Sequence, residues 1–172
     1  KLILVSRTAL PDREEWDQIL QSQIENEQLS QRINHIQKLE SLGAKVMTAV
    51  ADVADEEQMR NVIHQAEANF GHINGVIHAA GVADYLGIMM NREKESNNKI
   101  LAPKIKGTLV LDALLKDEPI DFFVLCSSIG NVAYHMKFGQ SGYNAANEFL
   151  DAFAFYKRAH DGVFTVAINW PD

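Results

Sequence analysis

The sequence predicts a doubly wound α/β fold, in which helices cover both faces of a parallel sheet. Apolar runs of strand length alternate with segments whose apolar residues recur at helical spacing, a pattern typical of strand–helix–strand units. The chain has 172 residues, of which 47% are hydrophobic and 23% are charged. That length suits one domain, which can bury a core without help from a metal or a disulfide.

The first part of the chain predicts two strands joined by a long helical connection. Leu2–Ser6 is the first predicted strand. The polar stretch over residues 8–42 carries apolar residues at helical spacing, which predicts one or two surface helices in an unusually long connection. Gly43 is predicted to end this helical region, and residues 45–51 form the next strand.

The rest of the chain predicts three strands and four helices. The strands are expected within residues 75–81, 121–126 and 165–168. The helices are expected at residues 55–70, 93–101, 104–115 and about 143–160. Asp55 begins the first of these helices with a capping-box pattern, and Pro103 is expected to separate the second from the third. The run at 121–126 is continuously apolar, which predicts a strand covered on both faces.

Charge and composition exclude several classes of protein. Sixteen basic and 23 acidic residues give a net charge of −7, whereas a nucleic-acid-binding protein normally presents a basic face. The apolar runs are well short of the roughly 20 residues that span a bilayer, so no membrane partner is expected. The one cysteine, Cys126, cannot form an internal disulfide and suits a reducing compartment, which predicts a cytoplasmic protein. The histidines show no metal-ligand spacing, so no metal is expected.

The two ends of the sequence predict a piece of a longer polypeptide. The chain opens at Lys1 on a strand-like run, with neither an initiator methionine nor a signal-peptide pattern, and it stops at Asp172 just after another such run. Cleavage of a precursor is the alternative explanation.

Polar residues at the carboxyl ends of two predicted strands indicate a nucleotide site. Arg7 follows Ser6 at the first strand end, where an arginine favours a ribose 2′-phosphate and hence NADP; a solvated surface charge is the alternative. Asp52 and Val53 end the next strand and could face an adenine edge, or they form an ordinary turn. No Gly-x-Gly-x-x-Gly turn occurs among the ten glycines, so either the chain binds no dinucleotide or the phosphate loop precedes Lys1.

Four side chains form the candidate catalytic group. Tyr143 and Asn147 lie four residues apart on one face of a predicted helix. Ser128 ends a buried strand, and Lys104 begins a predicted helix. Each of the four is a common structural residue when taken alone.

Together with their surroundings, these residues carry a family resemblance. The segments are 51–55 (ADVAD), 78–82 (HAAGV), 101–107 (LAPKIKG), 121–128 (DFFVLCSS), 139–152 (GQSGYNAANEFLDA) and 168–170 (INW). In this order they resemble the ketoreductase domain of modular type I polyketide synthases, which belongs to the short-chain dehydrogenase/reductase superfamily with its Rossmann-like fold. On this resemblance, residues 1–172 are a partial ketoreductase catalytic subdomain with a polar helical insertion at about 8–42.

The resemblance implies NADPH-dependent reduction of a β-ketoacyl thioester carried on an acyl carrier protein. Tyr143 would donate a proton to the keto oxygen while hydride from NADPH reaches the carbon. A nearby Lys104 ammonium would favour the phenolate and so make Tyr143 a better acid near neutral pH. Ser128 would hydrogen-bond the substrate oxygen, and Asn147 would position the lysine or a water relay.

The same resemblance implies a cofactor site and partners. The residues around NADPH would be Ser6, Arg7, Asp52, Val53, Ala79, Ala80 and Gly81, with Arg7 at the 2′-phosphate, Asp52 and Val53 at the adenine, and the last three beside the ribose. The partners would be an acyl carrier protein with a phosphopantetheine-bound substrate and the other domains of the same synthase.

Several features depart from the family pattern. The spacing of 15 from Ser128 to Tyr143 is longer than the family usually shows, so residues 134–138 must bulge. Residues 83–85 (ADY) stand where one stereochemical class carries Leu-Asp-Asp, which leaves the direction of hydride attack open. The glycine-rich loop, its strand beside Leu2–Ser6, and the substrate lid expected after Pro171 are absent from the sequence.

Two functions from different classes therefore remain. The presence of all four catalytic side chains supports an active ketoreductase. The alternative is an inactive pseudo-ketoreductase that organises neighbouring synthase domains, and the longer serine spacing is its best support. A free-standing reductase for small alcohols is disfavoured because Asn147 occupies the position where most short-chain reductases carry lysine.

Overall fold

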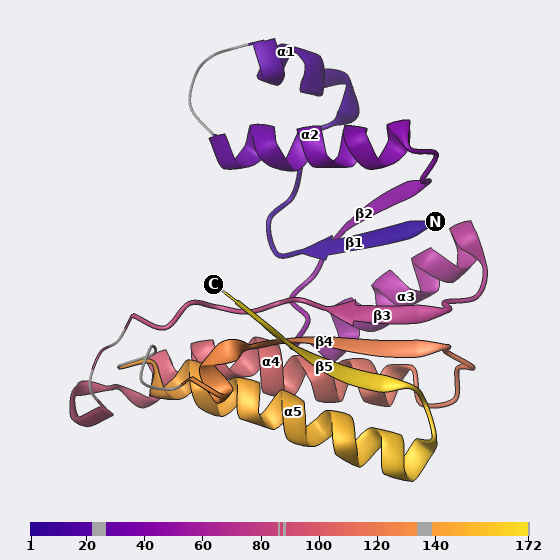
Figure 1. Ribbon diagram of the computed structural model, residues 1–172. Coiled ribbons are helices and arrows are strands. Elements are labelled where there is room, and N and C mark those ends of the chain that lie inside the picture. Colours follow the sequence, from indigo (N-terminus) through magenta and orange to yellow (C-terminus); the bar gives the residue numbers. More distant parts are fainter. Residues whose placement is uncertain (22–26, 86, 88, 134–138, 172) are drawn as a thin grey trace.

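The computed structural model describes residues 1–21, 27–85, 87, 89–133 and 139–171 (Figure 1). Its strands are β1 (Leu2–Ser6), β2 (Val46–Val50), β3 (Gly75–His78), β4 (Phe122–Ser128) and β5 (Thr165–Trp170). Its helices are α1 (Trp16–Gln21), α2 (Glu27–Ser41), α3 (Glu56–Phe70), α4 (Lys94–Leu114) and α5 (Ser141–Asp161), with short 3-10 turns η1 (Arg13–Glu15), η2 (Met89–Asn91) and η3 (Ile129–Asn131). The predicted α/β class is confirmed. Among the described residues, none of the helices has the length and hydrophobicity of a membrane-spanning segment.

The strands form two parallel sheets instead of one. β1 pairs with β2, from Leu2 opposite Val46 to Ser6 opposite Val50, and a second sheet has the order β3-β4-β5. In Figure 1, β1 lies between β2 and β3. The sheet is therefore interrupted at the position where the family resemblance expects a further central strand.

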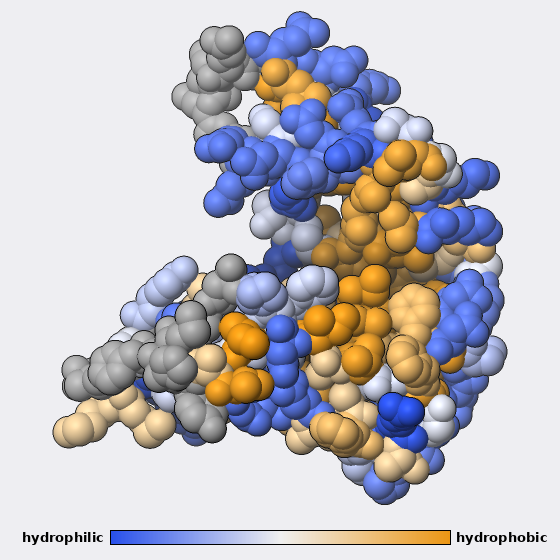
Figure 2. Space-filling model, in the orientation of Figure 1, coloured by the Kyte–Doolittle hydropathy of each residue, from blue (hydrophilic) through white to orange (hydrophobic). Residues whose placement is uncertain are grey.

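The β1-β2 sheet is covered on both faces. Leu4 packs against a small core formed by Trp16, Ile33 and Ile36, whereas Ile3 packs against the larger core on the opposite face. This alternation follows from the two-residue period of a strand. In Figure 2 the hydrophobic side chains gather over the strands, while hydrophilic residues dominate the outer helices α1 and α2.

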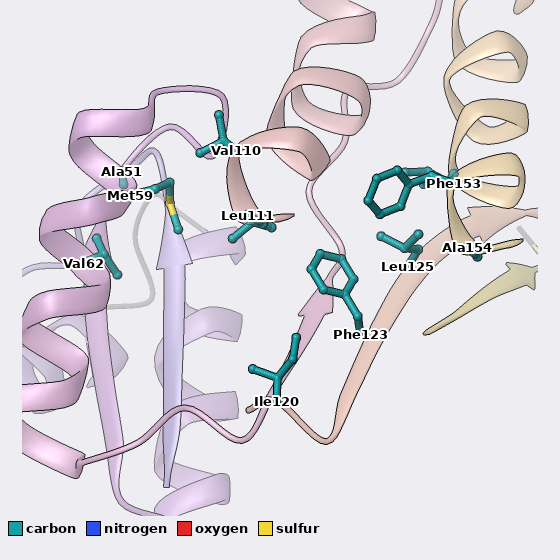
Figure 3. Close-up of a cluster of buried hydrophobic side chains, with 11 residues drawn as sticks. Ala51, Met59, Val62, Val110, Leu111, Ile120, Phe123, Leu125, Phe153 and Ala154 are labelled. Carbon is teal, nitrogen blue, oxygen red and sulfur yellow. The ribbon is translucent and has the colours of Figure 1, made fainter. Parts of the chain in front are cut away.

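The larger core lies on one face of the β3-β4-β5 sheet. Phe123 and Leu125 of β4 are fully buried against Leu111 of α4 and Phe153 of α5 (Figure 3). The prediction that β4 is covered on both faces is wrong. Over the described residues α4 and α5 pack on the same face, so the alternate side chains of β4 are only half-buried, and Ile77 in the neighbouring strand is 67% exposed.

Pro103 does not divide its helix, contrary to the sequence prediction. α4 runs unbroken from Lys94 to Leu114, and residues on both sides of the proline, among them Ile100 and Lys104, are buried. Proline in a helix interior costs about 3 kcal/mol. Because the buried face continues through Pro103, tertiary packing outweighs that local preference.

The remaining boundaries differ by a few residues, and two of the differences matter for the site. β4 extends to Ser128 and β5 to Trp170, which pair with each other at the end of the sheet. α5 begins at Ser141, two residues earlier than expected, which places Tyr143 in its first turn. The predicted bulge at residues 134–138 lies outside the described residues.

The buried histidine His78 links β3 to α4. Its Nε2 lies 3.0 Å from the Pro103 carbonyl oxygen, which assigns the proton to Nε2. Burial is the main reason that its pKa is lowered to about 4, with the Lys104 charge acting in the same direction. His78 is therefore neutral at physiological pH and has the structural role that its place on a buried strand predicts.

Replacing His78 with glutamine should flatten the pH dependence of stability in weakly acidic solution. The folded protein resists protonation of His78 until about pH 4, whereas the unfolded chain takes up the proton near pH 6.5. Stability due to the neutral imidazole is therefore complete above pH 6.5 and declines as the pH falls towards 4, by roughly 3 kcal/mol. Urea unfolding between pH 7 and 4.5 measures this slope. The control is His64→Gln, at an exposed position of α3.

Candidate active site

A cavity of about 590 Å³ lies at the carboxyl ends of β3, β4 and β5, beside the first turn of α5. We call it the large cavity, and its lining residues are Ala79, Gly81, Val82, Ala83, Asp84, Tyr85, Lys104, Cys126, Ser127, Gln140, Tyr143 and Trp170. Carboxyl ends of parallel strands are where ligands bind in open α/β sheets. The location of the large cavity therefore agrees with that of an active site.

Lys104 and Tyr143 meet on the wall of the large cavity. The Lys104 side chain reaches across from α4, and its Nζ donates a 2.7 Å hydrogen bond to the Cys126 carbonyl at the end of β4. The same Nζ lies 5.6 Å from the centroid of the Tyr143 ring, a cation–π distance. Lys104 is only 4% exposed, and burial lowers its pKa, although electrostatic interactions with Cys126 and Asp151 oppose the shift.

Asn147 supports Tyr143 from behind the cavity wall. It is fully buried one turn further along α5, and its Nδ2 donates a 2.9 Å hydrogen bond to the Tyr143 carbonyl oxygen. Its Oδ1 is buried without a hydrogen-bond partner among the described residues. A buried acceptor of this kind is normally satisfied by a donor such as ordered water.

The two adjacent serines at the end of β4 have different positions. Ser127 lies on the cavity wall, and its Oγ donates to the Asn147 carbonyl oxygen at 3.3 Å. Ser128 is buried, and its Oγ accepts a 3.1 Å hydrogen bond from the Gly130 amide. Of the two serines, Ser127 lines the cavity and Ser128, the candidate chosen from the sequence, does not.

A second, smaller cavity of about 330 Å³ lies at the carboxyl ends of β1 and β2 and includes Ser6. Arg32 of α2 lines it and donates from Nη2 to the Ser6 hydroxyl at 2.8 Å and to the Thr8 carbonyl at 3.2 Å. Arg7 is exposed next to Ser6. In the part of the chain that the structure describes, neither Arg7 nor Arg32 forms an ion pair with a carboxylate.

Asp52 and Val53 form the turn between β2 and α3. The Asp52 side chain accepts a 2.9 Å hydrogen bond from the Ala54 amide, and Val53 packs against the larger core. A Cβ added to Gly107 of α4 would lie 2.7 Å from a Val53 methyl group, so this glycine permits the close packing.

A sequence model of the KR domain family matches residues 1–172. The chain belongs to the KR (ketoreductase) domain family. Its relatives include 6-methylsalicylic acid synthase of Aspergillus terreus (strain NIH 2624 / FGSC A1156), 38% identical over 171 residues that cover 99% of this chain and 9% of the relative. Polyketide synthase PksL of Bacillus subtilis (strain 168) is 33% identical over 174 residues, which cover all of this chain and 4% of that protein. The ketoreductase chain thus spans a tenth or less of the length of these relatives.

Solved ketoreductase structures share the fold. An N-terminal ketoreductase from the macrolactin assembly line matches with a TM-score of 0.76 and 34% identity over 99% of this chain and 31% of that chain. A ketoreductase domain from the bacillaene assembly line matches with a TM-score of 0.77 and 30% identity over 98% of this chain and 37% of that chain. The sequence-based identification is confirmed, and this family of oxidoreductases uses a nicotinamide cofactor.

The ketoreductase fold brings some of the predicted site residues together and separates others. Lys104 and Tyr143 share the large cavity with Ala79 and Gly81, and Asn147 contacts the lining residues Tyr143 and Ser127. Ser128 follows Ser127 in β4 and does not line the cavity. Ala80 is exposed between its two neighbours and does not line the large cavity. Ser6, Arg7, Asp52 and Val53 belong to the β1-β2 region, which has its own cavity. No described group of three or more His, Cys, Asp or Glu side chains could hold a metal ion.

Proposed function

We propose that this ketoreductase domain reduces a β-ketoacyl thioester, carried on an acyl carrier protein, to the β-hydroxyacyl thioester with NADPH as the reductant. One observation carries the proposal: the Lys104 ammonium lies 5.6 Å from the Tyr143 ring centroid on the wall of a cavity at the sheet's carboxyl edge. A phenol beside a buried cation can release a proton to a substrate oxygen, which reduction of a ketone requires.

Each catalytic side chain has a defined part in this reaction. Tyr143 donates the proton to the keto oxygen. The Lys104 ammonium, held by the Cys126 carbonyl, stabilises the phenolate that remains. Asn147 holds the first turn of α5 through its bond to the Tyr143 carbonyl, and its Oδ1, which has no hydrogen-bond partner among the described residues, can accept a bond from a water molecule. When bound, NADPH supplies the hydride that reduces the carbonyl carbon.

Ser128 remains the proposed hydrogen-bond donor to the substrate oxygen. Its hydroxyl accepts from the Gly130 amide, which leaves its own proton available for donation. Ser127, which lies on the cavity wall, bonds the backbone of Asn147. We therefore assign Ser127 a supporting role through the backbone of α5.

The described residues fit part of NADPH. Arg7 and Arg32 place two guanidinium groups at the end of β1, and a 2′-phosphate would give them an anionic partner, which none of the described residues provides. At the large cavity, a Cβ on Gly81 would lie 3.1 Å from Lys104 Cε, so the glycine lets the backbone pass close to the lysine. None of the ten glycines forms a Gly-x-Gly-x-x-Gly turn, so these residues contribute no such loop to the pyrophosphate site.

Replacing Arg32 with methionine should weaken binding of 2′,5′-ADP to the full-length protein by about tenfold or more and leave binding of 5′-AMP unchanged. A charge-assisted hydrogen bond contributes roughly 1.5–3 kcal/mol, and only the first ligand carries the 2′-phosphate. Calorimetric titration of both nucleotides measures the difference. The control is Arg13→Met, because Arg13 pairs with Glu40 and does not line the second cavity. Equal weakening for both nucleotides would contradict the assignment.

We propose that the ketoreductase acts in the cytoplasm beside the other domains of a polyketide synthase and receives its substrate on a phosphopantetheine arm. Membership of the KR domain family and the similarity to Aspergillus and Bacillus synthases support this proposal. We also propose that residues 8–42, which include α1 and α2, form a helical insertion in a partial catalytic subdomain that extends over residues 1–172.

The full-length protein tests the proposed function when it is supplied with NADPH and a 3-ketoacyl thioester of pantetheine or of an acyl carrier protein. We expect oxidation of NADPH and formation of the 3-hydroxyacyl thioester, with deuterium from 4-deuterated NADPH appearing at carbon 3. A wild-type protein that reduces neither thioester would refute the proposal and favour the alternative of an inactive, domain-organising ketoreductase.

A further inference from the structure

A buried carboxylate binds the first turn of the helix that carries Tyr143. Asp84 follows β3 and is 2% exposed. Its Oδ2 accepts a 3.1 Å hydrogen bond from the Gly142 amide and a 3.2 Å hydrogen bond from the Tyr143 amide. The carboxylate thus holds the backbone of Tyr143 itself, at the helix end where negative charge is favourable.

Arg92 fixes this carboxylate and joins three segments of the chain. Its side chain is 1% exposed, and its Nη1 donates to Asp84 Oδ2 at 2.8 Å and to Asn97 Oδ1 at 3.2 Å. Its Nε and Nη2 donate to the Gly87 carbonyl oxygen at 3.1 and 2.8 Å, and Nη2 also donates to the Gly139 carbonyl oxygen. The loop after β3, the start of α4 and the segment before α5 therefore share one guanidinium group.

Glycines allow these segments to approach closely. Gly139 and Gly87 have φ angles of 76° and 72°, and a Cβ on Gly139 would lie 3.3 Å from Gly87 Cα. A Cβ on Gly142 would lie 3.2 Å from Asp84 Oδ2 and 3.3 Å from Arg92 Nη1. The ion pair therefore has little room in which to shift.

We infer that Asp84 and Arg92 are positioning residues for the reduction: they set the place of the Tyr143 phenol relative to the Lys104 ammonium. The inference rests on the proposed function of Tyr143. Desolvating an ion pair is costly, and a well-packed apolar pair of similar volume is often no less stable, so stability alone gives little reason for this arrangement. Displacement of a reacting group by about 1 Å can lower a rate by about 100-fold, which gives a strong reason for holding the first turn of α5 in place.

The test uses two substitutions in the full-length protein that disturb the pair without removing its side chains. Asp84→Asn retains the shape and an acceptor oxygen but loses the charge, and Gly142→Ala pushes against the carboxylate while favouring the helix. The matched control is Asp55→Asn. Asp55 also accepts a hydrogen bond from a backbone amide at a helix start, that of Gln58 at 3.0 Å, and it does not line the large cavity.

We expect kcat for the β-ketoacyl thioester to fall at least tenfold in Asp84→Asn and Gly142→Ala, with KM within about twofold of wild type. Amide hydrogen exchange at Gly142 and Tyr143, measured without substrate, should accelerate in Asp84→Asn. Asp55→Asn should keep the wild-type kcat even if it lowers the unfolding temperature.

Three results would overturn the inference. One is a kcat that stays within twofold of wild type in both variants while exchange accelerates, because the pair would then be a helix cap only. Another is a rise in KM with constant kcat, because the loop would then serve substrate binding. The third is a loss of kcat in Asp55→Asn equal to that in Asp84→Asn, because the effect would then follow stability. A wild-type protein that reduces no β-ketoacyl thioester is a different outcome, and it refutes the proposed function as a whole.

Discussion

Replacing Tyr143 with phenylalanine should lower kcat for β-ketoacyl thioester reduction by about a thousandfold. Proton donation by a positioned side chain contributes roughly 10²- to 10⁴-fold to a rate, and phenylalanine removes the proton while keeping the ring that lies beside Lys104. Because the substrate-binding surface is otherwise unchanged, KM should change little. Steady-state NADPH oxidation by the full-length protein, with the product identified by mass spectrometry, measures both constants.

Tyr156→Phe is the matched control for this substitution. Tyr156 lies on the same helix, is 55% exposed and does not line the large cavity, so the loss of its hydroxyl should leave kcat unchanged. If the two variants have equal activity, the phenol of Tyr143 is not the proton donor, and the proposed mechanism is wrong even where the ketoreductase itself is active.

Replacing Lys104 with methionine should lower kcat by about 100-fold or more and should also change the pH profile. Methionine keeps most of the volume of the side chain but removes the ammonium that would stabilise the Tyr143 phenolate. Burial lowers the pKa of Lys104, so the wild-type rate should fall on the alkaline side at a pH below the usual lysine value of 10.5. In Lys104→Met the contribution of the lysine to this alkaline limb should be lost, so the limb should move from its wild-type position.

A second buried lysine, Lys157, provides a control that distinguishes an effect on catalysis from an effect on stability. Lys157 on α5 is 2% exposed and pairs with Asp112 at 2.5 Å and Asp161 at 2.9 Å, away from the lining of the large cavity. Lys157→Met should therefore lower the unfolding temperature and keep the alkaline limb of the rate. An alkaline limb that keeps its wild-type position in Lys104→Met would show that Lys104 does not set it, and would remove Lys104 from the mechanism.

The strands could be predicted from the sequence because their signals are local. An apolar run such as Leu2–Ser6 is continuous and bounded by polar residues, and Asp55 supplies the cap that begins α3. The unbroken α4 could not be predicted, because the packing that overrides Pro103 comes from residues distant in the sequence. The same applies to the half-buried face of β4, since the apolar sequence of a strand does not reveal which helices cover it.

The residues of the candidate site, too, could be predicted from the sequence only in part. Tyr143 and Asn147 are one helical turn apart, so their proximity follows from spacing alone, whereas the approach of Lys104 required the family resemblance. Arg32 escaped prediction because 26 residues separate it from Ser6. The contact of Asp84 and Arg92 with the site could not be predicted either, since the Tyr143 amide that bonds to Asp84 is 59 residues away in the sequence.

The interruption between β1 and β3 has a consequence for the behaviour of the chain in solution. In the described structure each of these strands has only one hydrogen-bonded neighbour, so backbone groups along its other edge are free to pair with a strand from elsewhere. The apolar side chains of Val5 and Ile77, 38% and 67% exposed, lie on these two strands. Expressed without further sequence, these 172 residues should self-associate by edge-to-edge strand addition and accumulate as insoluble aggregates.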